Sequence, residues 1–138
     1  MSPSFNSIFN VAHSGLGAQT QRLQVVAENL ANSRVAGAKP GEDPYRRKVI
    51  TFTNEMDRAT GDRLLQSRVA EDEAHSFLTE FNPGHPAADA RGYVRMPNVN
   101  MFIELADLKE ANRSYQANLQ TIRSARELYN ATVELLKG

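Results

Sequence analysis

The two ends of the chain carry the same spacing of apolar residues, and this spacing constrains the fold more than any other feature. Near both termini, apolar positions recur at alternating steps of three and four residues. Such steps average about 3.5 residues, the period at which one face of a helix stays against a partner helix. We therefore predict two long terminal helices that pair with each other. The contact positions, called the seam below, are Phe9, Leu16, Leu23, Val26, Leu30, Leu105, Leu108, Tyr115, Leu119, Ile122, Tyr129, Val133 and Leu136.

Five further positions belong to the two series. They are Ala12 and Gln19 in the first, and Met101 with the polar Asn112 and Arg126 in the second. Polar residues on such a face usually set register and partner at some cost in stability. Off the seam of the second helix, a solvated face is expected at Glu104, Lys109, Glu110 and Arg113.

Two glycines, Gly15 and Gly17, interrupt the first helical pattern. Each costs up to about 1 kcal/mol relative to alanine in a helix interior. Two interpretations stay open. Either the glycines are simply tolerated, or they mark a close approach between helices or a flexible joint.

Between the helices the pattern changes to that of short strands. Segments rich in β-branched or aromatic residues, bounded by turn residues, occupy 47–53, 64–70, 77–81 and 92–96. Ser4 is a usable cap for the first helix, which should end near Ser33, and Pro97 with Asn98 should begin the second. We predict a mainly α fold with a small antiparallel β unit (α+β). An inner domain would combine residues 1–36 and 98–138, with a loop at 37–44 and a β-rich middle domain at 45–97.

Composition excludes several classes of protein. Lys and Arg number 16, as do Asp and Glu, so the chain has no basic excess for binding nucleic acid. It has no cysteine, hence neither disulfides nor thiolate metal sites. No apolar run reaches the roughly 20 residues of a membrane-spanning helix. The N-terminus has neither the basic nor the apolar region of a cleavable secretory signal.

Charge is sparse in the first helix. Residues 1–36 hold only Arg22, Glu28 and Arg34. This is either an ordinary polar, uncharged face or the mark of a helix that neighbouring chains surround on several sides.

Four stretches, in the right order along the chain, resemble the flagellar basal-body rod protein family, and within it the proximal rod subunits of the FlgC type. They are AENLANS at 27–33, PYRRKV at 44–49, NPGHPAADARGYV at 82–94 running into PNVN at 97–100, and ANRSYQAN at 111–118. The matching residues are Asn29, Leu30, Asn32, Pro83, His85, Pro86, Gly92, Tyr93, Asn98, Asn100, Arg113, Tyr115 and Asn118. The loop after residue 33 departs from the usual family turn, and Gln116 replaces a common glutamate.

The resemblance implies a structural subunit that polymerises helically into the rod, the hollow shaft that transmits torque across the periplasm. Its terminal helices would pair in an inner domain lining the channel. Export would use the flagellar type III apparatus without a cleaved leader. The implied partners are other rod proteins, copies of the chain itself, and the export gate or basal-body adaptor at the rod base.

Enzymatic and ligand-binding functions find little support. His13, His75 and His85 lie in different elements without metal-ligand spacing. A hydrogen bond between His85 and Asp89 would be structural. The segment 57–62 lacks the alternating oxygen ligands of a calcium loop and is interpreted as a solvated turn. We expect no catalysis, cofactor, metal or small-molecule substrate, and we expect the basic residues 46–48 to be a solvated run.

A different kind of assembly stays open on the pattern alone. A soluble two-helix adaptor or chaperone-like coiled coil would form a closed homodimer through one self-complementary patch. A filament subunit instead needs two different complementary surfaces.

Overall fold

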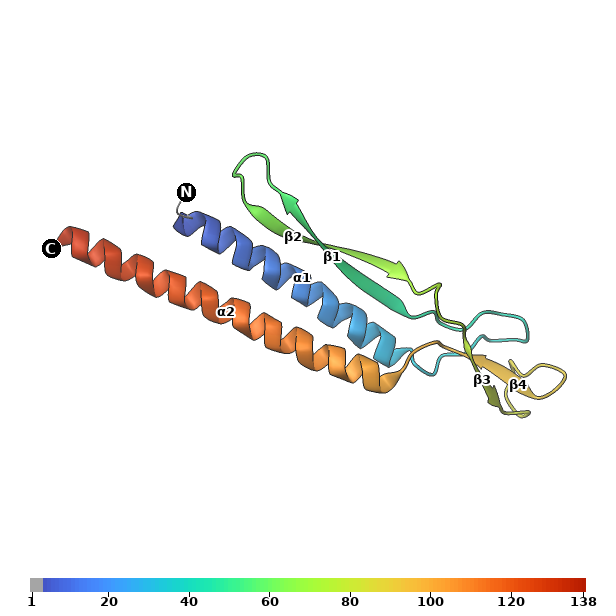
Figure 1. The fold of residues 1–138 in the computed structure, drawn as a ribbon. Helices are drawn as coiled ribbons and strands as arrows, with labels where there is room; N and C mark the ends of the chain where they lie inside the picture. Colours follow the sequence, from blue (N-terminus) through green and yellow to red (C-terminus); the bar gives the residue numbers. More distant parts are fainter. Residues whose placement is uncertain (1–3) are drawn as a thin grey trace. The chain divides into compact units, whose positions relative to one another are not determined.

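The computed structural model describes residues 4–138 and has two long helices with four strands between them (Figure 1). In chain order the elements are α1 (Phe5–Ala31), β1 (Lys48–Met56), β2 (Arg63–Glu71), β3 (Leu78–Phe81), β4 (Tyr93–Met96) and α2 (Met101–Lys137). The predicted α+β class is confirmed. Residues 1–3, part of the predicted N-terminal segment, lie outside the described residues.

Side-chain caps begin both helices. The Ser7 amide donates to Ser4 Oγ at 3.2 Å, so the predicted cap of α1 is confirmed. The cap of α2 is Asn100, whose Oδ1 accepts a hydrogen bond from the Phe102 amide at 3.0 Å. The second helix therefore begins later than Asn98, because the Asn98 side chain binds other segments instead.

The strands form two separate two-stranded sheets, β1–β2 and β3–β4, a division that the sequence pattern did not indicate. The turn 57–62 joins β1 to β2, with the Asp57 amide donating to the Asp62 carbonyl at 2.8 Å. Strands β3 and β4 are antiparallel, from Leu78 opposite Met96 to Phe81 opposite Tyr93.

The described chain divides into two compact units, which are considered one at a time. Unit 1 contains residues up to 23, 51–68 and 109–138. Its buried apolar side chains are small: Ala12 and Ala18 from α1, and Ala111 and Ala125 from α2. A Cβ at Gly15 would lie 2.9 Å from Asn118 Oδ1, whereas one at Gly17 would meet nothing within 4 Å. Gly15 thus marks a close approach between helices, while Gly17 is merely tolerated.

The β1–β2 hairpin is hydrogen-bonded to the polar face of α1 within unit 1. Asp62 Oδ1 accepts from Ser7 Oγ at 2.5 Å, and Asp62 Oδ2 accepts from Asn10 Nδ2 at 3.0 Å. These two hydrogen bonds lower the pKa of Asp62. The prediction of a solvated turn is therefore wrong for Asp62, which is buried. Part of the charge-poor face of α1 is covered by the chain's own hairpin.

Unit 2 contains residues 24–50 and 69–108. Its buried apolar residues are Val25, Val26, Ala87, Val94 and Val99. Beside them lie four buried polar residues, Asn29, Asp72, Asn98 and Glu104. Within residues 4–138, neither helix combines the length and apolar character that crossing a membrane requires.

Candidate functional site

Asn29, in the last turn of α1, is the centre of a buried polar cluster in unit 2. Its side-chain amide donates to the Lys48 carbonyl at 2.8 Å and to Glu104 Oε2 at 3.1 Å. Its Oδ1 accepts from the Lys48 amide and from the Tyr45 hydroxyl, both at 2.9 Å. All four hydrogen bonds that an asparagine side chain can make are thus present, in a residue that is 1% exposed. One side chain thereby joins the end of α1, the start of β1 and the start of α2.

Glu104, in the first turn of α2, has a side chain with no exposed surface. Its Oε1 lies 2.5 Å from Arg47 Nε, while Oε2 accepts from Asn29. The prediction that Glu104 lies on a solvated face is therefore wrong. A buried carboxylate is tolerated only when it is paired and hydrogen-bonded, and Arg47 with Asn29 meets both conditions.

Arg47 links Glu104 to a second buried carboxylate. Its Nη1 lies 3.4 Å from Asp72 Oδ2, and its Nη2 lies 3.9 Å from Asp107 Oδ2. Burial lowers the pKa of Arg47, but the hydrogen bonds and charges of Glu104 and Asp72 outweigh it, so the pKa is raised. The expectation of a solvated basic run at 46–48 is wrong here, because partners far along the chain enclose the guanidinium.

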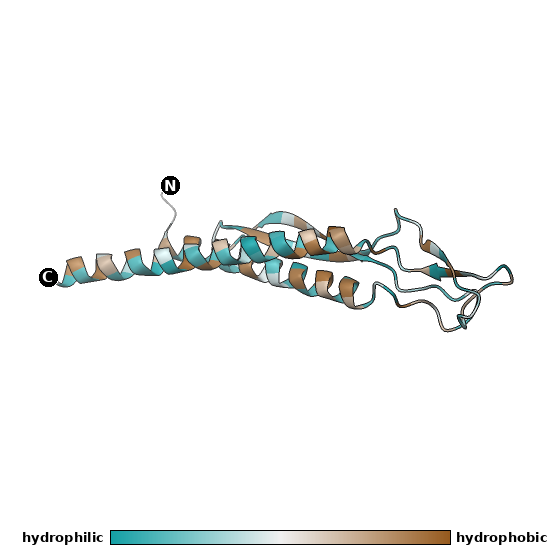
Figure 2. Ribbon diagram, turned by 90° about the horizontal axis from the view of Figure 1, so that it is seen from below, coloured by the Kyte–Doolittle hydropathy of each residue, from teal (hydrophilic) through white to brown (hydrophobic). Residues whose placement is uncertain are grey.

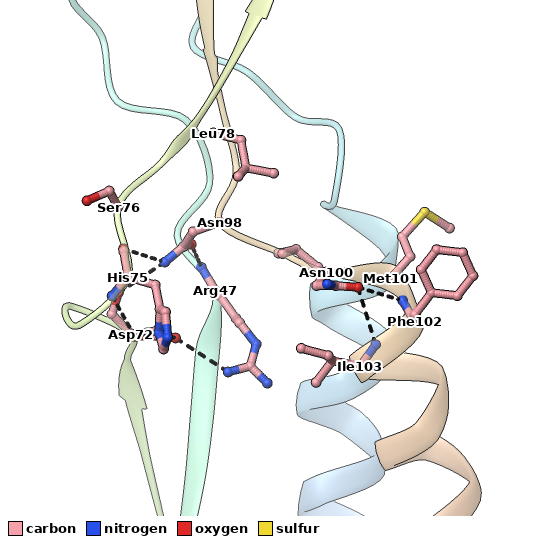
Figure 3. A pocket seen from close by; sticks show the side chains of 11 residues that line it. Arg47, Asp72, His75, Ser76, Leu78, Asn98, Asn100, Met101, Phe102 and Ile103 are labelled. Carbon is pink, nitrogen blue, oxygen red and sulfur yellow. Dashed lines mark hydrogen bonds and ion pairs between the residues drawn. The ribbon is translucent and has the colours of Figure 1, made fainter.

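Asn98 closes the cluster from the segment before α2. Its Oδ1 accepts from the Arg47 amide at 2.7 Å. Its Nδ2 donates to the carbonyls of Asp72 at 3.2 Å and His75 at 3.0 Å (Figure 3). Burial raises the pKa of Asp72, but the hydrogen bonds of His75 and Arg47 outweigh it, so the pKa is lowered. Two asparagines of the family signature therefore belong to one cluster.

Lys48 and Tyr45 complete the cluster on the side of α1. Lys48 Nζ lies 2.5 Å from Glu28 Oε1. Burial raises the pKa of Tyr45 to about 12, with further contributions from the charges of Glu28, Glu104 and Glu71. The Tyr45 phenol consequently remains a neutral hydrogen-bond donor to Asn29. We call the set Asn29, Tyr45, Arg47, Lys48, Asp72, Asn98 and Glu104 the polar junction.

The polar junction is suited to holding segments in place rather than to chemistry. Each of its charged side chains has an opposite charge within 4 Å. The side-chain amides of Asn29 and Asn98 bind the backbone of two separate segments, residues 47–48 and residues 72–75. A buried network in which every member is satisfied specifies a single arrangement of the elements that it connects.

The signature around His85 forms a turn between β3 and β4. The Ala87 amide donates to His85 Nδ1 at 3.0 Å, and Asp89 Oδ1 accepts from the Arg91 and Tyr93 amides at 2.9 Å. Gly92 has φ of +85°, and a Cβ there would lie 2.9 Å from the Phe81 ring. The histidine hydrogen bond is thus local, as expected, but its partner is Ala87 rather than Asp89.

The predicted family residues fall into three groups by exposure. Asn29, Gly92 and Asn98 are buried; Leu30, Asn32, His85, Tyr115 and Asn118 are half-buried; Pro83, Pro86, Tyr93, Asn100 and Arg113 are exposed. Only Asn29 and Asn98 meet in the polar junction. Asn118 instead faces Gly15 in unit 1.

The seam positions also differ in exposure. Val26 is buried; Phe9, Leu16, Leu23, Leu30, Leu108, Tyr115, Leu119, Ile122 and Val133 are half-buried; Leu105, Tyr129 and Leu136 are exposed. On α2 the buried positions next to the seam are Glu104, Ala111 and Ala125, with Asn118 half-buried between the alanines. Small residues let two helices approach closely, which suits Gly15 on α1. Larger seam side chains such as Leu105 are therefore exposed in the single chain.

The sequence analysis did not identify five members of the polar junction, which are Tyr45, Arg47, Lys48, Asp72 and Glu104. A signal for Glu104 existed, because Glu104, Ala111, Asn118 and Ala125 recur every seven residues beside the seam. For Asp72 no local pattern was available. Its partner Arg47 lies 25 residues away.

Among residues 4–138, no three His, Asp or Glu side chains gather as a metal site would require. His75 Nδ1 contacts Asp72 at 2.9 Å, and His85 contacts a backbone amide, so these imidazoles lie in different local settings.

Two family models match the two ends of the chain. The model for flagella basal body rod proteins matches residues 9–39, and the model for the C-terminal part of flagellar basal body rod FlgEFG proteins matches residues 90–135. These ranges contain α1 and α2 almost completely. They also contain Asn29, Asn98 and Glu104 of the polar junction.

Curated relatives match over nearly the full length. The chain is 50% identical to the flagellar basal-body rod protein FlgC of Agrobacterium fabrum, over 93% of this chain and 92% of the relative. It is 39% identical to that of Salmonella typhimurium, over 94% and 96%. It is 32% identical to that of Borreliella burgdorferi, over 97% and 98%. Because both the family models and the full-length relatives match, the chain belongs to the flagellar basal-body rod protein family, in its FlgC-type group.

Proposed function

We propose that the chain is a structural subunit of the bacterial flagellar basal-body rod, in its proximal part, and that it polymerises through its terminal helices. The observation that carries the proposal is the polar junction. It fixes the end of α1, the start of β1 and the start of α2 against one another through Asn29, Arg47 and Glu104.

A rod that transmits torque needs subunits whose parts resist rotation against each other. Apolar packing alone is non-directional, whereas hydrogen bonds have preferred distances and angles. In the polar junction, Asn29 makes its full set of hydrogen bonds and Glu104 pairs with Arg47. Such a network would keep the paired helices at one angle to the segment that follows them.

The seam would supply the contacts between subunits. Leu105, Tyr129 and Leu136 are 48%, 49% and 82% exposed in the single chain. Burying such side chains against neighbours contributes roughly 1.5–3 kcal/mol each when burial is complete. In this proposal, residues 1–36 and 98–138 form the inner domain, residues 45–97 the middle domain and residues 37–44 the loop between them.

The remaining parts of the proposal follow from family membership. The subunit would reach the periplasm through the flagellar type III apparatus without a cleaved signal. At the base of the rod it would meet the export gate or basal-body adaptor. Its role would be wholly structural, with no substrate turned over. The closed-homodimer adaptor is not favoured, because relatives that match the chain from end to end are rod proteins.

The experiment that tests the proposal is complementation of a strain lacking this chain. Leu119→Asp should remove swimming and the chain's presence in purified basal bodies, because a carboxylate would be desolvated in an apolar contact. Gln120→Asp, at the exposed neighbouring position of α2, is the matched control and should assemble normally.

A second pair tests α1 in the same way. Leu30→Asp should block incorporation, and Ala31→Asp, at an exposed position, should permit it. Immunoblots of secreted protein would separate failure of export from failure of assembly. Normal swimming of both leucine variants would contradict the proposal that the seam makes the contacts.

A further inference from the structure

Gln19, in the middle of α1, is buried in unit 1 without the hydrogen bonds that its side chain can make. The residue is 8% exposed, and its Oε1 has no hydrogen-bond donor among residues 4–138. Buried polar groups almost always have a partner, because an unpaired one keeps the full cost of its desolvation. Gln19 therefore weakens the helix pair of the free subunit.

The contacts of α1 with α2 in unit 1 show how the two helices are aligned. The rings of Phe5 and Tyr129 pack edge to face, with centroids 5.7 Å apart. Further along α1, Gly15 faces the side-chain amide of Asn118. The helices are therefore antiparallel, since the partner number falls as the position on α1 rises.

This alignment brings Ser114 of α2 to the level of Gln19. Gln19 follows Gly15 by about one turn, and Ser114 precedes Asn118 by about one turn. Ser114 is half-buried, and its hydroxyl makes no hydrogen bond to any residue of the described chain. A serine hydroxyl can donate and a glutamine oxygen can accept, so the two unpaired groups are complementary.

Unit 1 gives the helices room to shift, because small side chains make the contact. Ala12, Ala111 and Ala125 are its buried apolar residues on the facing rows, and contacts of this kind have no preferred direction. Hydrophilic residues, drawn teal, recur among apolar ones along α2 (Figure 2). A small displacement of α2 along α1 thus changes which polar groups meet while it costs little apolar packing.

We propose that the helix pair of unit 1 has two states, and that Gln19 distinguishes them. In the free subunit Gln19 Oε1 is unpaired. On incorporation into the rod the pair shifts, and Oε1 accepts a hydrogen bond from the Ser114 hydroxyl. This inference rests on the proposed rod function and names a conformational change that accompanies assembly. The neighbouring subunits select the second state by packing against exposed side chains of α2 such as Tyr129.

Gln19→Met tests the proposal, because methionine has a similar length but cannot take part in this hydrogen bond. In the free chain the change removes an unpaired buried group, so the midpoint of thermal unfolding should rise by roughly 3–8 °C. In a complemented strain the amount of the chain in purified basal bodies should fall at least about fivefold, with secretion unchanged. Gln24→Met, at an exposed position of α1, is the matched control and should change neither quantity.

Ser114→Ala tests the donor. Because the hydroxyl is unpaired in the free chain, the unfolding midpoint should change no more than it does for Ser124→Ala, a half-buried serine of the same helix. Incorporation into basal bodies should nevertheless fall several-fold for Ser114→Ala and stay normal for Ser124→Ala.

Other outcomes would overturn the inference. A lower unfolding midpoint for Gln19→Met means that Gln19 already has a partner in the free chain, such as a bound water. A higher midpoint with normal incorporation means that Gln19 is merely tolerated, and loss of secretion means that it acts in export. Normal incorporation of Ser114→Ala removes the proposed donor. In all these cases the rod function stands, whereas absence of the unmodified chain from basal bodies would refute the rod function itself.

Discussion

The two units of this chain share the same pair of helices yet hold them by different means. In unit 1, α1 and α2 meet through small residues such as Gly15, Ala18 and Ala111, and little apolar volume is buried. In unit 2, Asn29 and Glu104 join the same helices by hydrogen bonds and a buried ion pair. Small residues permit a close approach but specify its geometry weakly. Paired polar groups specify it strongly, because any displacement leaves them unsatisfied.

The two contacts therefore have different roles in holding the helix pair. The polar junction fixes one register and angle where the helices begin and end. The small-residue contact lets the rest of the two helices lie close together, while large seam side chains such as Leu105 and Leu136 are exposed. If so, changes in the polar junction should be far more costly than changes elsewhere on the helices.

The largest effect is expected for Glu104→Ala. The change leaves Arg47 and the Asn29 amide without their buried partner, which costs about 3–5 kcal/mol. Glu110→Ala is the matched control, because Glu110 is exposed and its pair with Arg22 at 3.5 Å is worth at most about 1 kcal/mol. Urea unfolding followed by circular dichroism measures both. Equal losses would mean that the buried pair has no special role.

A somewhat smaller loss is expected for Asn29→Ala. The Lys48 peptide, the Tyr45 hydroxyl and Glu104 each lose a partner, and a buried unsatisfied polar group costs about 1–3 kcal/mol. We expect a total loss of about 3 kcal/mol in the free energy of unfolding, because these groups share one site and their costs do not add fully. Asn130→Ala, an exposed position on α2, should be neutral or slightly stabilising. If Asn29→Ala destabilised the chain no more than Asn130→Ala does, the hydrogen bonds assigned to Asn29 would be contradicted.

The two glycines of α1 should respond with opposite signs. Gly15→Val pushes a branched side chain against Asn118, which should cost about 1–3 kcal/mol. Gly17→Ala meets nothing within 4 Å and should stabilise the helix by up to about 1 kcal/mol. Thermal unfolding monitors both. Recovery of Gly15→Val by adding Asn118→Ala would locate the clash, and a stabilised Gly15→Val would refute the close approach.

The smallest effect concerns alkaline pH. The pKa of Tyr45 is raised to about 12 from the ordinary value of 10.0, chiefly by burial. Its stabilising contribution is therefore complete below about pH 10 and is lost as the pH rises toward 12, because the unfolded chain deprotonates first. At pH 8 the free energy of unfolding of Tyr45→Phe should be about 1 kcal/mol below that of the unmodified chain. At pH 11 this difference should be smaller. Urea midpoints at the two pH values measure it, with exposed Tyr93→Phe as the control; a constant gap would contradict the assignment.

The sequence predicted the local elements well, because their signals are local. The Ser4 cap, the two helices and the four strands all follow from residues adjacent in the chain. The inner face of α2 was harder. Two rows of residues lie beside Leu108 and Ile122 on α2, one with Leu105 and Leu119 and the other with Ala111 and Ala125. From side-chain size alone, the leucines would be predicted to face α1. The alanines face α1 instead, because α1 and α2 come close together at Gly15 and leave no room for leucines there. This contact depends on the partner helix and is not encoded in the sequence of α2.

The polar junction could not be read from local pattern. Arg47 looks like part of a surface cluster in sequence, since its partners Asp72 and Glu104 lie 25 and 57 residues away. Burial of a charge depends on whether such partners arrive, and no periodicity encodes that. The family signature indicated Asn29 and Asn98 but not what they bind.

Amide hydrogen exchange on the dilute full-length chain tests the comparison between the two units most directly. Helices without sufficient packing are marginal in water, whereas a satisfied junction resists local opening. We predict that amides in residues 24–31 of α1 and in the second turn of α2, residues 105–108, exchange at least about tenfold more slowly than those in residues 9–23 and 109–133. Uniform protection along both helices, or strongest protection in residues 9–23, would contradict the account.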